Sequence, residues 1–224
     1  MYVTQRQQGE SGRSYALRTI KENIVRLELA PGSKVSESEI AAGLGLSRTP
    51  VREALQELSR VRIVEIYPQR GSIIALVDYT LVDEARFMRQ CLECGVADVL
   101  AQRAGTMDFS ALRENLELQE YYLRSGNLDK LLELDNQFHQ ELYRLAGYEN
   151  CYRMMAGMYL HFDRVRWMAT QSVNQEPCVE DHRAIYQAIV EGNSREAAEV
   201  VREHLMRYRV DETKLRREYP GYFK

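Results

Sequence analysis

The sequence predicts a mainly α-helical protein: an N-terminal winged helix-turn-helix of three helices and a β-hairpin wing, then an antiparallel all-α bundle of about six helices. Hydrophobic residues recur at helical spacing through most of the chain. A β-rich stretch interrupted by a turn occurs near residues 63–77. Beyond it, short breaks separate helical segments of roughly 20 residues, the pattern of an antiparallel bundle. The predicted helices lie near residues 80–104, 108–125, 127–147, 149–171, 176–192 and 194–216. The expected domains are residues 1–77 (the head) and 78–224 (the body).

The two expected domains differ in charge. The 224 residues carry a net charge of -3, with 11 Lys and Arg against 8 Asp and Glu in the head. The body holds the remaining 19 basic and 25 acidic residues. A basic head on an acidic body is consistent with a head that meets phosphate groups.

The composition indicates a protein of the cytoplasm with no membrane partner. No apolar run approaches membrane-spanning length, and the polar start at residues 1–12 is not a signal peptide. Four cysteines in a chain of this length do not indicate a disulfide framework. Cys91 and Cys94 form a C-x2-C pair without a second pair or a nearby histidine. We interpret them as buried free thiols in a helix, with a metal or redox role as the alternative.

The first two helices of the head have recognisable ends. Apolar residues at helical spacing predict a helix over residues 14–29, which Pro31-Gly32 stops. Ser36 and Glu39 form a capping box that opens the second helix. Two glycines are expected to close it, Gly43 and Gly45.

A third helix and a hairpin complete the head. Ser47 is the expected N-cap of the third helix, and Pro50 is tolerated within the first turn. β-rich residues follow at 63–66 and 72–77, and residues 68–71 (Pro-Gln-Arg-Gly) form the turn between them.

The third helix has the residues of a DNA major-groove reader. Arg48 and Arg52 lie four positions apart and so project from one face, where arginine can grip guanine with two hydrogen bonds. Ser47 and Thr49 are short donors suited to phosphate oxygens. At the tip of the wing, Arg70 and a glycine permit close approach to the sugar-phosphate backbone; the glycine is Gly71. The alternative is a solvated charged helix in which the serine is only a cap.

The body contains a candidate metal site. Asp135 and His139 lie one helical turn apart and can share a cation. His182 and His204 are far enough apart in sequence to come from two antiparallel helices. One carboxylate and three imidazoles in a bundle core would suit Zn2+, Ni2+, Mn2+ or Fe2+. The alternative is that each histidine is exposed or is a satisfied core residue.

The head resembles the GntR family of bacterial transcription regulators. The resemblance rests on residues 36–55 (Ser-Glu-Ser-Glu-Ile-Ala through Ser-Arg-Thr-Pro-Val-Arg-Glu-Ala-Leu) and on the later Pro-Gln-Arg-Gly, and it covers most of residues 14–77. It implies a homodimer that binds a short palindromic operator in double-stranded DNA. The residues implied at the DNA are Ser47, Arg48, Thr49 and Arg52, with Glu37 and Ser38 at the start of the preceding helix. Some relatives carry arginine where this chain has Ser38, and residues 62–64 depart from the usual Gly-Leu-[IV].

The body resembles the FCD ligand-binding domain that defines a GntR subgroup. Three landmarks carry the resemblance, residues 134–139, 181–189 and 203–205, within a match of roughly residues 80–212. In such domains an Asp and three His bind a divalent metal that contacts a small carboxylate effector. The resemblance therefore implies four ligands in this chain: Asp135, His139, His182 and His204. His161 lies outside the landmarks, so it either faces the same cavity or belongs to the core or surface.

Arginines in the body raise a further question about the effector. Arg89 occupies the arginine of the family's R-x2-[LIV]-E pattern and is the expected effector-binding residue, since a guanidinium can clamp a carboxylate with two bonds. The alternative is an ion pair with Glu93, one turn away. The sequence does not decide whether Arg164 or Arg166 lines the cavity.

Together these features predict a metabolite-responsive transcription regulator, a repressor, and not an enzyme. A metal-dependent enzyme is the competing class, because a metal with an open position can activate water. No recognisable general-base motif accompanies the proposed ligands. A third alternative is a purely structural metal, or none, with the effector recognised by other contacts.

Overall fold

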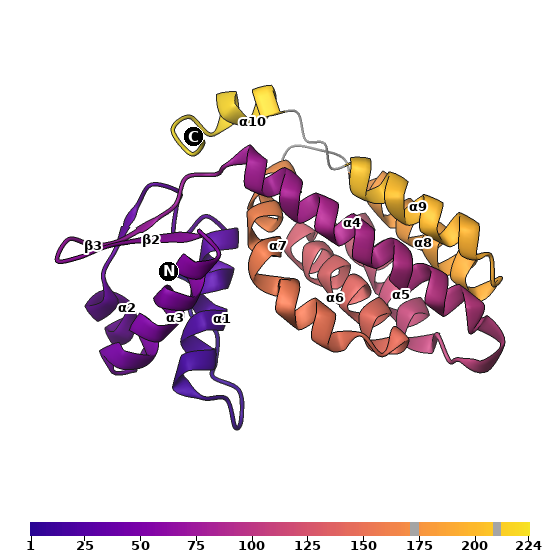
Figure 1. Ribbon diagram of the computed structural model, residues 1–224, viewed down its shortest axis with the longest axis horizontal. Coiled ribbons are helices and arrows are strands. Elements are labelled where there is room, and N and C mark those ends of the chain that lie inside the picture. Colours follow the sequence, from indigo (N-terminus) through magenta and orange to yellow (C-terminus); the bar gives the residue numbers. More distant parts are fainter. Residues whose placement is uncertain (171–174, 208–211) are drawn as a thin grey trace. The chain divides into compact units, whose positions relative to one another are not determined.

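The computed structural model describes residues 1–170, 175–207 and 212–224. It consists of two compact units. The first comprises Met1–Val82, Gly157–Val165 and Glu212–Lys224, and the second comprises Asp83–Ala156 and Arg166–Asp211. The mainly helical class is confirmed, with helices α1 to α10 and a small antiparallel sheet among the described residues (Figure 1). The domain boundary between residues 77 and 78 stays a prediction.

Helix α1 spans Gly12–Val25, so the predicted span of 14–29 is wrong at both ends. It begins earlier because the Ser11 hydroxyl accepts a hydrogen bond from the Ser14 backbone N–H and caps the first turn. It ends earlier because Leu27 takes a left-handed backbone conformation, with φ of 61°. The turn that follows brings Leu29 against the core of the first unit.

Helices α2 (Glu37–Leu44) and α3 (Arg48–Arg60) form the helix-turn-helix. The Ser36 cap is confirmed, since its hydroxyl accepts from the Glu39 N–H. Gly45 closes α2 with φ of 64°, a conformation that costs glycine little, whereas Gly43 lies inside the helix.

The wing has three strands and not two. Strands β2 (Val64–Tyr67) and β3 (Gly71–Ile74) form the predicted hairpin. A two-residue strand, β1 (Lys34–Val35), pairs with the other edge of β3, which gives the order β1-β3-β2 with all pairs antiparallel. Two residues are too few to carry an alternating pattern, so β1 has no recognisable signal in the sequence.

The bundle helices lie close to their predicted positions (Figure 1). They are α4 (Tyr79–Gln102), α5 (Ser110–Ser125), α6 (Leu128–Ala146), α7 (Glu149–Thr170), α8 (Glu176–Val190) and α9 (Ser194–Arg207), with a 3-10 turn at Ala104–Thr106. The prediction of one last helix to residue 216 is wrong, because α9 ends at Arg207 and α10 is a separate helix at Glu212–Glu218. Residues 171 and 208–211, which fall in predicted helices, lie outside the described residues.

Each unit has its own hydrophobic core. In the first unit α1 contributes Ile20 and Ile24, and α3 contributes Leu55 and Leu58, all buried. In the second unit buried residues of α4, α5, α6, α8 and α9 pack together. Within the described part of the chain, no helix is both long and apolar enough to cross a membrane.

Candidate DNA-binding surface and metal centre

The start of α3 presents its polar side chains to solvent. Ser47, Arg48, Thr49 and Arg52 are all exposed, while Val51, Ala54 and Leu55 of the same helix are buried. The Ser47 hydroxyl makes no capping hydrogen bond, so the interpretation of this residue as only a helix cap finds no support. The helix therefore has one face in the core and one face available to a partner.

Arg52 is held by a residue of the preceding helix. Its Nε and Nη2 atoms donate to the Glu37 carboxylate at 2.9 to 3.2 Å. This bidentate pair fixes the direction of the guanidinium across the α2–α3 turn. Ser38, the other residue predicted at the start of α2, is exposed, and its hydroxyl lies 2.8 Å from that of Ser36.

The tip of the wing joins β2 to β3 through residues 68–70. Arg70 is exposed there, and Gly71 pairs with Tyr67 while adopting φ of 93°, a region that side chains disfavour. An arginine beside a glycine is thus placed on an exposed turn, as predicted.

The four predicted metal ligands come together in the second unit. Asp135 and His139 lie on α6, His182 on α8 and His204 on α9, and each is at most 3% exposed. The Nε2 atoms of the three histidines lie 3.2 to 3.3 Å from one another. An Asp135 oxygen lies 3.6 Å from the His182 Nε2, and one ligand atom from each of the four residues fits within a span of 4.8 Å.

The other ring nitrogen of each histidine faces an oxygen atom. The His139 Nδ1 lies 2.7 Å from a Glu93 carboxylate oxygen, and the His182 Nδ1 lies 2.8 Å from the Gln119 Oε1. The His204 Nδ1 lies 3.4 Å from an Asp181 carboxylate oxygen. A neutral imidazole has one N–H and one lone pair. With the N–H groups on the Nδ1 atoms, three Nε2 lone pairs converge on one point.

The converging atoms fit a bound cation. Two nitrogen ligands about 2.1 Å from one ion lie about 3.0 to 3.4 Å apart for bond angles of about 90° to 109°. The observed separations of 3.2 to 3.3 Å fall in this range. Lone pairs at such distances repel one another unless a proton or a cation lies among them, so the donor set suits a divalent metal.

Burial and neighbouring charges hold the proposed ligands in the protonation states that bind a metal. Burial lowers the pKa of His139 to about 4 and that of His182 well below its usual value, so both imidazoles are neutral near pH 7. Burial alone would raise the pKa of Asp135, but Arg166 and the neighbouring histidines lower it below its usual value. Arg166 binds the Asp135 carboxylate directly and donates to the Asn136 Oδ1 at 3.0 Å.

Arg89 forms an ion pair with Glu93, which was the alternative to its expected role in binding the effector. Its Nε donates to a Glu93 oxygen at 2.6 Å, and both side chains are buried. The pair differs from a surface i,i+4 ion pair because it is buried and because the Glu93 carboxylate also faces the His139 Nδ1. Contact with an effector by Arg89 stays a prediction.

Arg164 and His161 lie outside the cluster, in the first unit. The His161 Nε2 lies 2.7 Å from the Val61 carbonyl oxygen, and the Arg164 Nη1 donates to the Ala75 carbonyl at 2.8 Å. Of the two arginines that the sequence left undecided, Arg166 is the one at the cluster.

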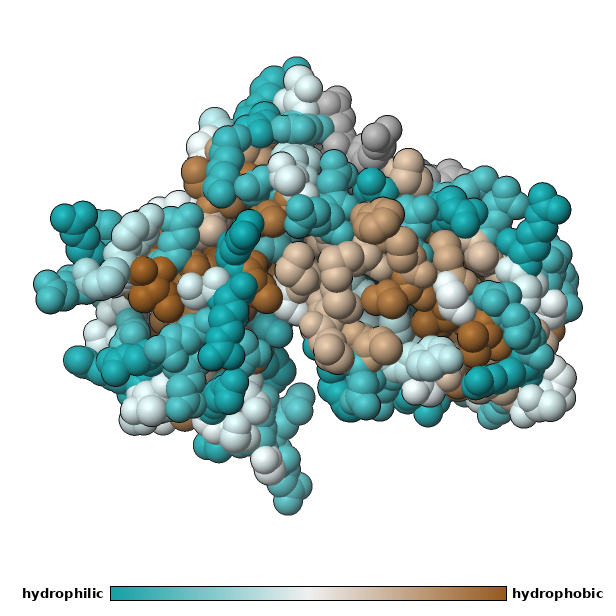
Figure 2. All heavy atoms as spheres, viewed as in Figure 1, coloured by the Kyte–Doolittle hydropathy of each residue, from teal (hydrophilic) through white to brown (hydrophobic). Residues whose placement is uncertain are grey.

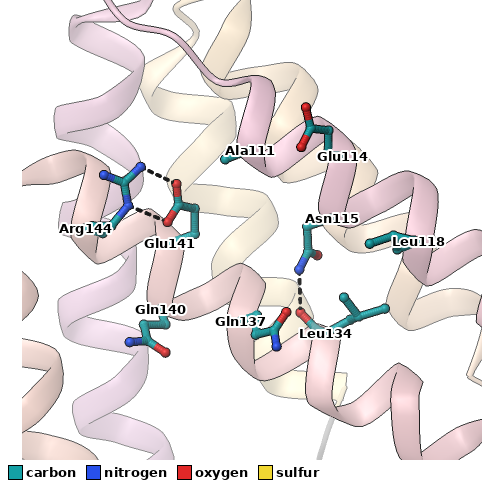
Figure 3. A pocket seen from close by; sticks show the side chains of 9 residues that line it. All are labelled: Ala111, Glu114, Asn115, Leu118, Leu134, Gln137, Gln140, Glu141 and Arg144. Atoms are coloured by element: carbon teal, nitrogen blue, oxygen red, sulfur yellow. Dashed lines mark hydrogen bonds and ion pairs between the residues drawn. The ribbon is translucent and has the colours of Figure 1, made fainter. Parts of the chain in front are cut away.

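A groove of about 370 Å³ lies between α5 and α6, and none of the proposed metal ligands lines it (Figure 3). Leu134, which precedes Asp135, and Asn115 of α5 line it, and the Asn115 amide donates to the Leu134 carbonyl at 3.1 Å. Cys91 and Cys94 are free thiols, but the expectation that they are buried is wrong, since Cys91 is exposed and Cys94 is half-buried.

Three residues that contact the proposed ligands have no assigned role in the sequence: Gln119, Asp181 and Arg166. Gln119 faces His182, Asp181 faces His204 and Arg166 binds Asp135, and in each pair the two residues lie on different helices. A single sequence carries no spacing signal for such contacts.

A winged helix-turn-helix followed by an all-helical bundle is consistent with a DNA-binding transcription regulator. The family model described as bacterial regulatory proteins, gntR family, matches residues 15–74, and the FCD domain model matches residues 84–207. The chain belongs to the GntR family of transcription regulators, in the group with an FCD domain.

Relatives and solved structures agree with this assignment. An HTH-type transcriptional regulator in an unstable DNA locus of Streptomyces ambofaciens is 34% identical, covering 96% of this chain and 91% of the relative. The HTH-type transcriptional repressor RspR of Escherichia coli K12 is 30% identical, covering 92% and 91%. Among solved structures, E. coli McbR/YncC has a similar fold, with a TM-score of 0.79 at 19% identity over 94% of this chain and 99% of that one. These families and relatives are transcription regulators and not enzymes, which decides against the enzyme alternative.

Proposed function

We propose that this chain is a repressor that binds a palindromic operator as a homodimer and responds to a small organic acid. The acid would bind at a divalent cation held by Asp135, His139, His182 and His204. The observation that carries the proposal is the convergence of three Nε2 atoms at 3.2 to 3.3 Å, each on a ring whose Nδ1 faces an oxygen. We expect the protein to act in the cytoplasm.

A cation at this site would supply a Lewis acid with coordination positions for a carboxylate ligand. The chain's own residues would orient the three imidazoles and supply one negative charge through Asp135. Arg166 lies against that carboxylate, so a second anionic group entering the site would meet its guanidinium. Arg89, beside Glu93, is the other candidate for an effector contact.

At the DNA, Arg48 and Arg52 would contact base edges in the major groove, with Ser47 and Thr49 on phosphates. The support is the exposed polar face of α3 and the Glu37 pair that orients Arg52. Glu37 and Ser38 would lie at the backbone beside α2, and the wing tip at Arg70 and Gly71 would approach the sugar-phosphate chain.

A homodimer would require a self-complementary surface, and the exposed hydrophobic side chains of the second unit are our candidate for it. Its exposed hydrophobic side chains include Phe87 on α4 and Met154 on α7, which are 63% and 83% exposed. Hydrophobic residues gather over these two helices in the view of Figure 2. Light scattering of the wild-type protein and of Phe87→Glu would test this surface. A wild-type monomer bound to a single half-site would contradict the proposal.

A test of the metal and effector roles uses the purified full-length protein. Elemental analysis should find one divalent cation per chain in the wild type and in His161→Gln, and none in His182→Ala or Asp135→Ala. Genome-wide mapping of bound sites would supply an operator and, from neighbouring genes, candidate acids. The two cluster variants should bind that operator while losing the several-fold change in affinity that the acid causes. A full response in both variants would exclude the metal from sensing.

A further inference from the structure

A line of three side-chain hydrogen bonds leads away from His182 through the interior of the bundle. The His182 Nδ1 lies 2.8 Å from the Gln119 Oε1, and the Gln119 Nε2 donates to the Asn115 Oδ1 at 2.6 Å. The Asn115 Nδ2 donates in turn to the backbone carbonyl of Leu134 at 3.1 Å. Gln119 is 0% exposed, so solvent does not offer its amide another partner, and Asn115 is 8% exposed.

The last member of this line sets the direction of every bond in it. A backbone carbonyl can only accept a hydrogen bond. The amide nitrogen of Asn115 must therefore face Leu134, which leaves its oxygen to face Gln119. Gln119 must then donate from its nitrogen to Asn115, which turns its own oxygen toward His182. An amide oxygen can only accept, so the His182 Nδ1 must carry the hydrogen.

The direction of these hydrogen bonds decides which nitrogen of His182 is available to a cation. A neutral imidazole with its hydrogen on Nδ1 has its lone pair on Nε2. The Nε2 of His182 is the atom that lies 3.2 Å from the His139 Nε2 and 3.3 Å from the His204 Nε2. The ring also stacks on Phe138, with centroids 4.5 Å apart, which restricts its rotation.

We propose that Gln119 and Asn115 are positioning residues that hold His182 in the metal-ligating tautomer. The proposal rests on the proposed function of the cluster as a cation site. The two residues lie four positions apart on α5, so they occupy one face of the helix. Helix α5 supplies no proposed ligand, but it packs against both α6 and α8. Its two amides connect His182 on α8 to the carbonyl of Leu134, the residue before Asp135 on α6. Figure 3 shows Asn115 making the final bond to Leu134.

The tautomer can be measured without any metal. The chain has four histidines, so a long-range proton–nitrogen NMR spectrum of 15N-histidine-labelled, chelator-treated protein at mildly alkaline pH contains four rings. The signals missing from His182→Gln identify His182. We expect its hydrogen on Nδ1 in the wild type and on Nε2, or shared between both, in Gln119→Leu. A wild-type ring with its hydrogen on Nε2, or an unchanged ring in Gln119→Leu, would overturn the proposal.

Zinc affinity, measured by competition with a chelator, gives the second readout. Loss of an outer-shell partner typically weakens metal binding about 10- to 100-fold, which is the expectation for Gln119→Leu. Gln119→Glu still offers His182 an acceptor but cannot donate to the Asn115 Oδ1, so it should bind zinc more tightly than Gln119→Leu does. Gln137→Leu, the same change at an exposed residue of α6, is the matched control and should leave both readouts unchanged.

The outcomes separate this inference from the proposed function. If the wild type binds no zinc, the proposed cation site is excluded, and the tautomer measurement still decides whether Gln119 orients His182. If the wild type binds zinc and Gln119→Leu binds it equally well, the positioning role is excluded. Should Gln119→Leu not fold, Asn115→Leu tests the same line of hydrogen bonds, because the Gln119 amide would then be free to turn over. We expect this variant to shift the His182 hydrogen toward Nε2 by less than Gln119→Leu would.

Discussion

The Nδ1 atom of His139 lies 2.7 Å from a carboxylate oxygen of Glu93, and the two side chains are 1% and 0% exposed. Burial alone would raise the pKa of Glu93, but the charges of Arg89 and His139 outweigh it and lower the pKa to about 2. Glu93 is therefore ionised at neutral pH and joins Arg89 to a candidate metal ligand. Its replacement should affect both stability and metal binding.

Glu93→Leu should destabilise the protein strongly. Removing one partner of a buried ion pair costs about 3 to 5 kcal/mol, because the remaining charge stays buried without that partner. Urea unfolding of the chelator-treated protein measures the change. Glu133→Leu, which removes a carboxylate from the exposed pair with Lys130, should cost less than about 1 kcal/mol. Equal effects of the two variants would contradict the buried role of Glu93.

Acidification should destabilise the metal-free protein between about pH 6.5 and pH 4. Burial lowers the pKa of His139 and of His161 to about 4, whereas an unfolded histidine titrates near 6.5. The folded state binds fewer protons in this window, so the stabilisation is complete above pH 6.5 and declines as the pH falls toward 4. Each histidine contributes on the order of 3 kcal/mol.

His161→Gln isolates one of these contributions. Glutamine can still donate to the Val61 carbonyl and accept from Arg164, as His161 does, but it does not titrate. The free energy of unfolding, measured against pH, should fall less steeply in this variant. An unchanged slope would show that His161 is not a source of the acid sensitivity.

Arg48→Ala should weaken specific operator binding. A bidentate arginine–guanine contact provides about 1 to 3 kcal/mol of discrimination, so the loss should concentrate on the cognate sequence. Arg70→Ala at the wing should weaken binding to all sequences alike and reduce the salt dependence by about one charge. Arg60→Ala, at the exposed far end of α3, is the control for charge and should leave specificity intact. Fluorescence anisotropy with cognate and scrambled duplexes measures all three.

Saturating zinc should stabilise the wild-type protein against unfolding. A ligand at 100 times its dissociation constant adds about 2.7 kcal/mol when it binds only the folded state. His204→Ala should lose most of this gain in a thermal melt, because it removes one Nε2 donor. His161→Gln should keep it, since His161 lies outside the cluster. A full zinc-induced shift in His204→Ala would exclude His204 as a ligand.

Phe223→Ala should destabilise the first unit. Phe223 is 9% exposed, stacks on Tyr79 with ring centroids 5.6 Å apart and forms a parallel bridge with Val77. Truncating a large buried aromatic costs about 3 to 5 kcal/mol, and partial exposure places this site at the lower end. Limited proteolysis near residue 79 and chemical denaturation measure the loss. Arg217→Ala, in the exposed part of α10, should have little effect.

Local signals in the sequence predicted most of the helices and part of the wing. Ser36 opens α2 and Gly45 closes it through hydrogen bonds within a few residues, so their roles are visible in the sequence itself. Asp135 and His139 share a helix face for the same reason, since the helical period places i and i+4 together. The early end of α1 and the separate α10 were missed, because the pattern of apolar residues continues past both breaks.

The sequence by itself determined the class of fold, the exposed polar start of α3 and the residue types available for a cation. Only the tertiary structure decided that His161 lies apart from the other three histidines and that Arg166, rather than Arg164, meets Asp135. The same holds for Gln119, which is 63 positions from His182 along the chain yet 2.8 Å from it in space. Helical periodicity sets which residues share a face, whereas the packing of one helix on another sets which faces meet, and that packing depends on the whole core.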